Sequence, residues 1–395
     1  MDTTPGRIWG MKSKHPGRWP GDGDKMFEAK PPPTMSPPAG RPDSPTNHSD
    51  MHRSSGRRLA WKTWEVWMTW QAAARAGLAI GVLTVWLGLA ACSEPPVPAL
   101  TVGMNTWVGY DPLVLARDRQ LIDTQQVKVV DLSSSSETLR HFRNGLLDAA
   151  ALTLDEALRL TDEGFDLRVV AVLDTSTGAD VVLANPAVQS LAQLHGAGIA
   201  VEGTTVGALM LERLLQAAGL ERTDVNVVNM EATLHLSALR SGHVSAAVSY
   251  EPVAGLLRAA GYKDIFDSRL TPGDIVDVLV VRASTLQERP AQVDALLAGW
   301  QRGLQALQER PEAAARLLAP GVELSPEDYL ATLQKLTFYS TEQSLELLSG
   351  APPALGQDAS RLVTTLQTMG LIKAAPDWRR LLAPEPARRL KETSE

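Results

Sequence analysis

Short apolar runs alternate with amphipathic stretches from residue 100 to about residue 284. The runs are rich in Val, Ala, Ile and Leu, which is typical of strands. The strands that this pattern predicts are 100–104, 127–132, 149–152, 167–173, 181–184, 198–201, 225–229, 246–249, 262–266 and 275–281. Because strands that alternate with helices pair through right-handed crossovers, the pattern predicts an α/β fold with parallel sheets.

Helices are expected between these strands and over most of the chain that follows them. Asp111 can cap a helix whose first turn takes Pro112, and Ser133 to Ser136 followed by Glu137 suit the start of another. The other helices predicted between strands are 154–161, 206–218, 232–241 and 252–260. The C-terminal part is predicted to be mostly helical, with segments at 285–309, 311–318, 326–335, 341–349, 355–370 and 376–382.

An internal similarity indicates two related halves. Aligning Gly145 with Gly242 superposes two segments 97 residues apart. In both segments a helix ends at the glycine, and a strand of small residues then runs into a polar loop. Ligands of open parallel sheets bind beyond the carboxyl ends of the strands. The sequence therefore predicts two lobes whose strand-end loops face each other across a cleft.

The chain before Cys92 differs in composition from the rest. It carries twelve Lys and Arg against seven Asp and Glu, whereas the chain from Cys92 on carries 26 against 38; the whole chain has a net charge of −7. Residues 1 to about 50 are rich in Pro and Gly, which is typical of disorder. Basic residues then precede an apolar run at 76–91, which is short for a membrane span.

The apolar run ends in Leu-Ala-Ala-Cys, which resembles the lipobox of bacterial lipoproteins. The resemblance implies that Cys92, the chain's single cysteine, is acylated and becomes the mature N-terminus. A leader of 91 residues is long for such a signal, so we expect translation to start at Met68 or Met51. We divide this part into a disordered or untranslated leader at 1–67, a signal peptide at 68–91 and a tether at 92–98. A plain signal anchor is the alternative.

Composition and motifs argue against several other classes of protein. One cysteine rules out intramolecular disulfides, and the net acidity argues against binding to nucleic acid. The sequence has no phosphate-binding or dinucleotide-binding glycine motif, and the four histidines after Cys92 lack the spacing of a zinc site. We therefore expect no catalytic residues, no metal and no cofactor.

Several segments, in order, resemble periplasmic substrate-binding proteins. They are Trp-Val-Gly-Tyr-Asp-Pro at 107–112, Leu-Ala-Arg-Asp at 115–118, Gly-Leu-Leu-Asp-Ala-Ala at 145–150 and Tyr-Glu-Pro at 250–252. Within that class they are most similar to the nitrate, sulfonate, taurine and thiamine-pyrimidine-precursor receptors of ABC importers. The resemblance covers nearly all of 99–382. Gln120 and Ser245 depart from the family pattern, in which a helix-ending Gly and an Asp are common.

The resemblance implies a two-lobed α/β fold of the periplasmic binding protein type II. It implies crossover strands near 180–188 and 268–276, a first lobe built from 99–182 and 271–382, a second lobe at 183–270, and a tail at 383–395. It also implies an extracytoplasmic, lipid-anchored monomer that binds a small solute and delivers it to an ABC permease and its ATPase.

The candidate ligand-binding residues lie in loops at strand ends and at helix starts. Aromatic side chains there can stack on a ligand, and free backbone N–H groups at helix starts favour an anionic group. The candidates are Trp107, Tyr110, Ser134, Ser135, Thr153, Asp155, Asp174, Glu202, Thr205, Tyr250 and Glu251. Ordinary helix capping is the alternative role for the serines and threonines.

The charge of these loops indicates the class of ligand. They hold acids and no Lys or Arg, the acids being Asp155, Glu156, Asp174, Asp180, Glu202, Glu231 and Glu251. A receptor for a bare anion is expected to place a fixed positive charge in its site. We therefore expect an amine, an aminopyrimidine or a taurine-like zwitterion, with Glu251 as the acid chosen to contact it. The alternative function is a same-fold enzyme, or a sensor that presents its ligand to a membrane signalling protein.

Overall fold

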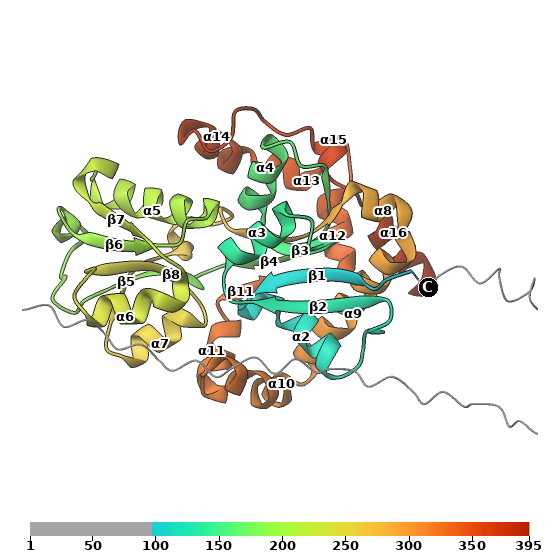
Figure 1. Ribbon diagram of the computed structural model, residues 1–395, viewed down its shortest axis with the longest axis horizontal. Helices are drawn as coiled ribbons and strands as arrows, with labels where there is room; N and C mark the ends of the chain where they lie inside the picture. The colour runs from blue at the N-terminus through green and yellow to red at the C-terminus, as the bar shows by residue number, and fades with distance from the viewer. Residues whose placement is uncertain (1–96, 395) are drawn as a thin grey trace, which may run out of the picture. The chain divides into compact units, whose positions relative to one another are not determined.

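Two β-sheets organise the part of the chain that the computed structural model describes, residues 97–394 (Figure 1). The expected leader and signal peptide, and Cys92 with most of the expected tether, lie outside these residues. Lobe 1 is the six-stranded sheet with the helices around it, and lobe 2 is the five-stranded sheet with its own helices. The chain passes from lobe 1 to lobe 2 at residues 177–179 and returns at 268–275.

The lobe 1 sheet has the strand order β11-β4-β10-β3-β1-β2. Its strands are β1 (Leu100–Asn105), β2 (Val127–Leu132), β3 (Ala149–Thr153), β4 (Leu167–Ser176), β10 (Val276–Arg282) and β11 (Leu336–Phe338). β1 is parallel to β2 and β3, whereas β10 is antiparallel to both β3 and β4. The carboxyl ends of β1 and β3 therefore lie at one edge, where the loops after them come together.

The lobe 2 sheet has the strand order β7-β6-β8-β5-β9. Its strands are β5 (Asp180–Ala184), β6 (Gly198–Val201), β7 (Asn226–Asn229), β8 (Ala246–Tyr250) and β9 (Lys263–Asp267). β6 is parallel to β7 and β8, and β5 is antiparallel to β8 and β9.

Helices cover both faces of each sheet (Figure 1). In the first part of lobe 1 they are η1 (Val108–Tyr110), α2 (Asp111–Asp118), α3 (Ser135–Arg143) and α4 (Leu154–Asp162). In lobe 2 they are η2 (Leu191–Leu194), α5 (Thr205–Ala218), η3 (Arg222–Asp224), η4 (Ala232–Leu234), α6 (His235–Arg240) and α7 (Val253–Ala259), with η5 (Ser268–Leu270) on the return to lobe 1. The C-terminal helices are α8 (Ala283–Glu288), α9 (Pro290–Glu309), α10 (Pro311–Leu318), η6 (Ala319–Val322), α11 (Pro326–Leu333), α12 (Thr341–Leu348), α13 (Ala354–Asp358), α14 (Ser360–Thr368), α15 (Trp378–Leu381) and α16 (Glu385–Ser394).

The mixed sheets correct the expectation of parallel pairing throughout. β5 and β10 each start just after the chain crosses from the other lobe. A parallel strand needs a crossover of a dozen or more residues, usually a helix. Only three residues separate β4 from β5, so β5 enters its sheet without one. The first crossing also lies before the expected segment 180–188, because 180–184 is already a strand of lobe 2.

The expected tail at 383–395 is also wrong, because most of it forms the helix α16. Ala387 on this helix is fully buried, and Arg389 pairs with Asp294 of α9 through hydrogen bonds of 2.9 and 2.7 Å. Two of the long expected helices are each divided in two, as α8 with α9 and α13 with α14. The short edge strand β11 was not expected at all.

Close packing of α9 on α2 holds the C-terminal helices to lobe 1. Gly303 lies where this contact is tightest, and a Cβ there would collide with the carbonyl oxygen of Pro112. Trp300 of α9 and Tyr329 of α11 are among the largest fully buried side chains. Within residues 97–394, no helix combines the length and apolar character needed to cross a bilayer.

Candidate functional site

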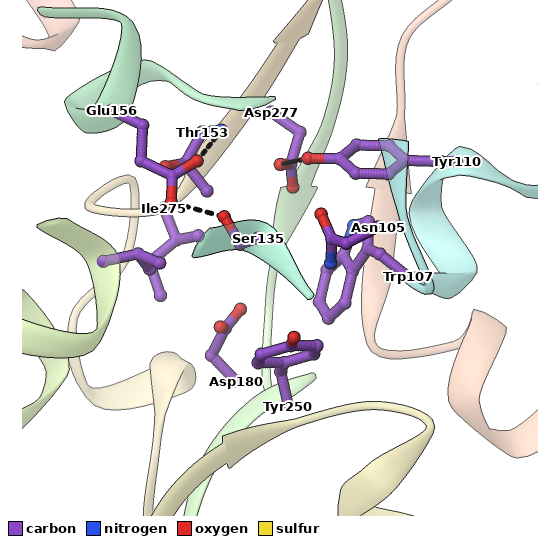
Figure 2. A pocket seen from close by; sticks show the side chains of 11 residues that line it. Asn105, Trp107, Tyr110, Ser135, Thr153, Glu156, Asp180, Tyr250, Ile275 and Asp277 are labelled. Carbon is purple, nitrogen blue, oxygen red and sulfur yellow. Dashed lines mark hydrogen bonds between the residues drawn. The ribbon is translucent and has the colours of Figure 1, made fainter. Parts of the chain in front are cut away.

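A cavity lies where the two lobes meet, and both lobes contribute to its wall (Figure 2). Its volume is about 30 Å³, so the lobes approach closely around it. The residues that line it are Asn105, Trp107, Tyr110, Ser135, Thr153, Glu156, Asp180, Val206, Tyr250, Ile275 and Asp277. None of these lining residues, all within the described part of the chain, is Lys, Arg or His.

Three aromatic side chains form one wall of the cavity. Trp107 and Tyr110 follow β1 and come from lobe 1, and Tyr250 ends β8 of lobe 2. The rings of Trp107 and Tyr250 meet edge to face across the lobes, with centroids 6.0 Å apart and planes at 73°. Aromatic walls give a planar or cationic group both contact area and a negative π face.

Glu156 lies opposite the aromatic wall at the start of α4. Ser135 Oγ donates a hydrogen bond of 2.6 Å to Glu156 Oε1, and the Thr153 backbone N–H donates to Oε2 at 3.2 Å. Glu156 thus closes the capping box of its own helix while it faces the cavity. Burial raises its pKa to about 7 against the opposing effect of these hydrogen bonds.

A pair of aspartates lies behind Tyr110. The Tyr110 hydroxyl donates to Asp277 Oδ1 at 2.5 Å, and Asp174 lies beside Asp277 on the neighbouring strand. Burial raises the pKa of Asp174 to about 7. The pKa of Asp277 lies well above its ordinary value, mainly because of burial and, second, because of the negative charge of Asp174. Gly109 permits this arrangement, because a Cβ there would collide with Asp174 and with the indole nitrogen of Trp107.

Asp180 faces the cavity from lobe 2, with its carboxyl group directed between Ser135 and Tyr250 (Figure 2). Its Oδ2 has no hydrogen-bond partner within residues 97–394, and burial raises its pKa to about 7. Asp155, which does not line the cavity, is also fully buried, and neither of its carboxyl oxygens has a described hydrogen-bond partner. Burial and the charge of Glu156 raise the pKa of Asp155 well above its usual range.

Glu202 bridges the two lobes at the edge of the cavity. It follows β6 in lobe 2, and its Oε1 accepts hydrogen bonds from the backbone N–H of Ser136 at 2.8 Å and from Ser136 Oγ at 2.7 Å. The Tyr250 hydroxyl donates to its Oε2 at 3.1 Å. The Glu202 carboxylate of lobe 2 therefore lies at the N-terminus of α3, which belongs to lobe 1.

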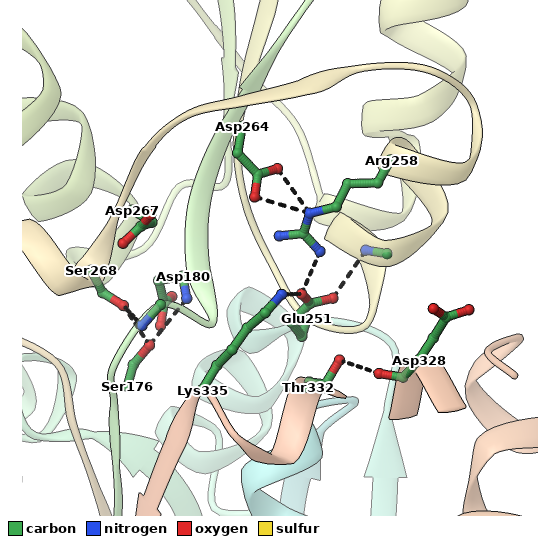
Figure 3. Close-up of polar contacts among 12 residues, drawn as sticks. Ser176, Asp180, Glu251, Arg258, Asp264, Asp267, Ser268, Asp328, Thr332 and Lys335 are labelled. Atoms are coloured by element: carbon green, nitrogen blue, oxygen red, sulfur yellow. Dashed lines mark hydrogen bonds and ion pairs between the residues drawn. The ribbon is translucent and has the colours of Figure 1, made fainter. Parts of the chain in front are cut away.

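Glu251 is placed differently from the sequence-based expectation. It is fully buried but outside the cavity wall, and its Oε1 pairs with Lys335 at 2.6 Å and with Arg258 at 2.5 Å (Figure 3). Lys335 comes from the C-terminal part of lobe 1, so this ion pair also joins the lobes. Two basic partners, one from α7 and one from distant sequence, thus pair with the acid that the sequence predicts to contact the ligand.

The cavity brings together only part of the predicted set. Trp107, Tyr110, Ser135, Thr153 and Tyr250 line it. The other candidates are not among its lining residues: Ser134, Asp155, Asp174, Glu202, Thr205 and Glu251. The hydroxyl of Ser134 caps α3 by accepting from the Glu137 N–H at 3.2 Å.

Sequence reasoning did not include Asn105, Val206, Ile275 and Asp277 at all, and it named Glu156 and Asp180 only as acids of the loops, not among the candidate ligand-binding residues. A signal existed for Asp277, since it is the only charged residue within the apolar run 275–281. His235 is buried in lobe 2 and outside the wall, and its burial lowers its pKa to about 4. No cluster of three or more His, Cys, Asp or Glu in the described chain is arranged to hold a metal ion.

Two mixed sheets joined by two crossings, with a cavity between them, define the class of two-lobed periplasmic binding protein folds. The chain belongs to the NMT1-like family, whose pattern matches residues 93–319, more than half of its length.

Known proteins similar to this chain agree with that class. A protein of Brucella abortus (strain 2308) named "Putative binding protein" is 29% identical over 177 residues, or 40% of this chain and 53% of that protein. The chain thus matches about half the length of that relative.

Solved structures share the fold at low sequence identity. The aliphatic sulphonate binding protein SsuA of Escherichia coli is 19% identical, with a TM-score of 0.58 over 73% of this chain and 92% of that one. The nitrate-binding protein NrtA of Synechocystis PCC 6803 is 15% identical, with a TM-score of 0.61 over 77% and 90%. The desulfurization enzyme DszB is 19% identical, with a TM-score of 0.56 over 75% and 100%.

Proposed function

We propose that this protein is the extracytoplasmic solute receptor of an ABC importer and that its solute carries an amine or another positive group. The family and the fold support the receptor role. Two of the solved structures with this fold are named as binding proteins for an aliphatic sulphonate and for nitrate. The observation that carries the choice of ligand is the cavity wall, which holds the carboxyl groups of Glu156, Asp180 and Asp277, three aromatic rings and no basic side chain.

The buried carboxyl groups favour a cation for a physical reason. A desolvated carboxylate is costly unless it is paired, which is why burial raises the pKa values of these acids. An ammonium or protonated amidine in the cavity supplies the missing counter-charge. A charge-assisted hydrogen bond contributes roughly 1.5–3 kcal/mol, or about ten- to a hundredfold in affinity. Taurine-like zwitterions and aminopyrimidines fit this requirement, and nitrate does not.

A thermal-shift screen tests this proposal. Amines, aminopyrimidines, taurine, sulfonates, nitrate and bicarbonate are added to the protein from Cys92 onward. A ligand at a hundredfold excess over its Kd stabilises the folded protein by about 2.7 kcal/mol. We expect amine-bearing solutes to raise the melting temperature and nitrate to leave it unchanged. A screen in which nothing shifts the melting temperature argues against a receptor.

We propose binding rather than catalysis. The lining hydroxyls of Ser135, Tyr110 and Tyr250 donate to the carboxyl groups of Glu156, Asp277 and Glu202, and none of the described residues that line the cavity is a histidine. This geometry does not activate a nucleophile. Mass spectrometry of a solute recovered after overnight incubation with the protein distinguishes the two functions, because a receptor returns it unchanged and an enzyme related to DszB does not.

We also propose that the protein is a monomer tethered to a bacterial membrane through a lipid on Cys92, with an ABC permease and its ATPase as partners. The lipobox-like ending Leu-Ala-Ala-Cys supports the anchor. Mass spectrometry of membrane-extracted protein tests it, since any residue retained before Cys92 in the mature species excludes acylation at its N-terminus. Cys92→Ala is expected to release the protein without changing its stability.

A further inference from the structure

The N-terminus of α3 is the strongest candidate anion site in the cleft by its local chemistry. The helix has nine residues, and its first turn carries Ser135, which lines the cavity, and Ser136 next to it in the sequence. Free N–H groups and the positive end of the helix dipole make such a turn attractive to an anion. In this protein the anion is already present, because the Glu202 carboxylate accepts from both the N–H and the hydroxyl of Ser136.

Glu202 is held in this position from its own lobe. Tyr250 donates to its second carboxylate oxygen at 3.1 Å, and Glu202 as a whole is only 4% exposed. The loop that carries it is fixed by the cap of α5, where Thr204 Oγ1 accepts from the Gly207 N–H at 3.1 Å and the Thr204 N–H donates to the Glu202 carbonyl oxygen at 2.8 Å. The carboxylate therefore reaches the other lobe from a rigid support.

We propose that Glu202 determines the charge class of the solute, because its carboxylate occupies the helix terminus that a solute's anionic group would otherwise take. This inference rests on the proposed receptor function and narrows it. For a nitrate, a sulfonate or the sulfonate end of a zwitterion, the N–H and the hydroxyl of Ser136 are already taken, and a negative charge lies in the anion's place. A cationic solute without an anionic end, such as an aminomethylpyrimidine, meets no such conflict.

The experiment compares the wild type with Glu202→Ala and Glu202→Gln by isothermal titration calorimetry. The probes are nitrate, methanesulfonate and an aminomethylpyrimidine. Glu212→Gln is the matched control, since it removes a carboxylate from the surface of α5 in the same lobe. Melting curves establish that each variant is folded. If the alanine variant is unstable, Glu202→Gln, which keeps the shape of the side chain, takes its place.

We expect wild type and Glu212→Gln to bind methanesulfonate at least tenfold more weakly than Glu202→Ala does, with Glu202→Gln between them. Equal anion affinity in wild type and in both Glu202 variants, within twofold, overturns the role of Glu202. The aminomethylpyrimidine separates this outcome from the proposed function. If the wild type binds the aminomethylpyrimidine and the Glu202 variants show no higher affinity for methanesulfonate, Glu202 has only a structural role and the proposed receptor function is retained. If the Glu202 variants bind methanesulfonate more tightly but neither the wild type nor any variant binds the aminomethylpyrimidine, Glu202 excludes anions and the proposed amine ligand is wrong.

Discussion

Asp180 is the acid whose position best matches contact with a solute. It lines the cavity, one of its carboxyl oxygens has no partner within residues 97–394, and burial raises its pKa to about 7. We expect Asp180→Asn to weaken binding of an amine about ten- to a hundredfold, because a charge-assisted hydrogen bond is lost. Calorimetry measures this change, and Asp358→Asn, on the exposed surface of α13, is the control. Unchanged amine affinity in Asp180→Asn contradicts the assignment.

Glu251→Gln is expected to act on stability rather than on affinity. The substitution removes the charge that holds both Arg258 and Lys335. Because these partners are about 30% exposed, water screens part of the loss, and we expect the free energy of unfolding to fall by about 1–2 kcal/mol. Urea denaturation measures it. Glu342→Gln, which removes the exposed pair with Lys391, should barely change stability. If Glu251→Gln instead keeps wild-type stability and binds the amine more weakly, Glu251 contacts the ligand and this assignment is wrong.

The aromatic part of the site could be predicted from the sequence, but the pairing of its acids could not. Trp107 and Tyr110 come shortly after β1 and Tyr250 ends β8, so the strand pattern alone places them at the sheet edge. Glu251, outside the cavity wall, pairs with Arg258 nearby in the sequence and with Lys335, which lies 84 residues away. Only the packing of the C-terminal helices brings it to the lobe interface, and no local pattern records that contact.

At the scale of elements, periodicity locates most strands because each is a short apolar run between polar turns. It does not give strand direction, because a strand can also enter a sheet after a short connection, with no α-helix before it. β5 and β10 lack that helix and are antiparallel to their neighbours. The helix α16 was missed because few of its described residues are buried, Pro386 and Ala387 among them, and this apolar signal is weak beside its many charged residues.

The contact between α2 and α9 yields a prediction at this scale. Gly303→Ala places a methyl group against the Pro112 carbonyl, and backbone cannot move aside as a flexible side chain can. We expect a loss of about 1–3 kcal/mol in unfolding free energy, typical of overpacking. The control is Gly321→Ala, where a Cβ meets no atom within 4 Å. Equal urea midpoints for the two variants would mean that the helices are not packed this closely in solution.

Across the whole molecule, the buried acids give the ligand-free protein an uncommon pH dependence. Burial raises the pKa values of Asp111, Glu156, Asp174 and Asp180 to about 7. Each folded-state pKa lies above the unfolded value near 4, so the folded state binds more protons between these values. The stability that these groups contribute is complete below about pH 4 and is lost as the pH rises to about 7.

Burial lowers the pKa of His235 to about 4, so the stability that this group contributes is lost as the pH falls. This effect opposes that of the four acids, but it comes from a single group. We therefore expect the melting temperature of the ligand-free protein to be higher at pH 5 than at pH 7.5. Differential scanning calorimetry at the two pH values checks this. A melting temperature that rises over the same interval would mean that these carboxyl groups are ionised and paired in the folded protein.

The most direct test of the central claim, that the interlobe cavity receives a cation, is the proton balance of binding. Titration calorimetry is carried out with an amine that stays fully charged from pH 6 to pH 8, in buffers of different ionisation enthalpy. An ammonium ion favours the ionised form of the carboxyl groups around it, so we expect proton release on binding at pH 6 and an affinity that rises toward pH 8. Nitrate or methanesulfonate should give no binding heat with the wild type. Tight binding of either anion, or proton uptake with the amine, would contradict the account.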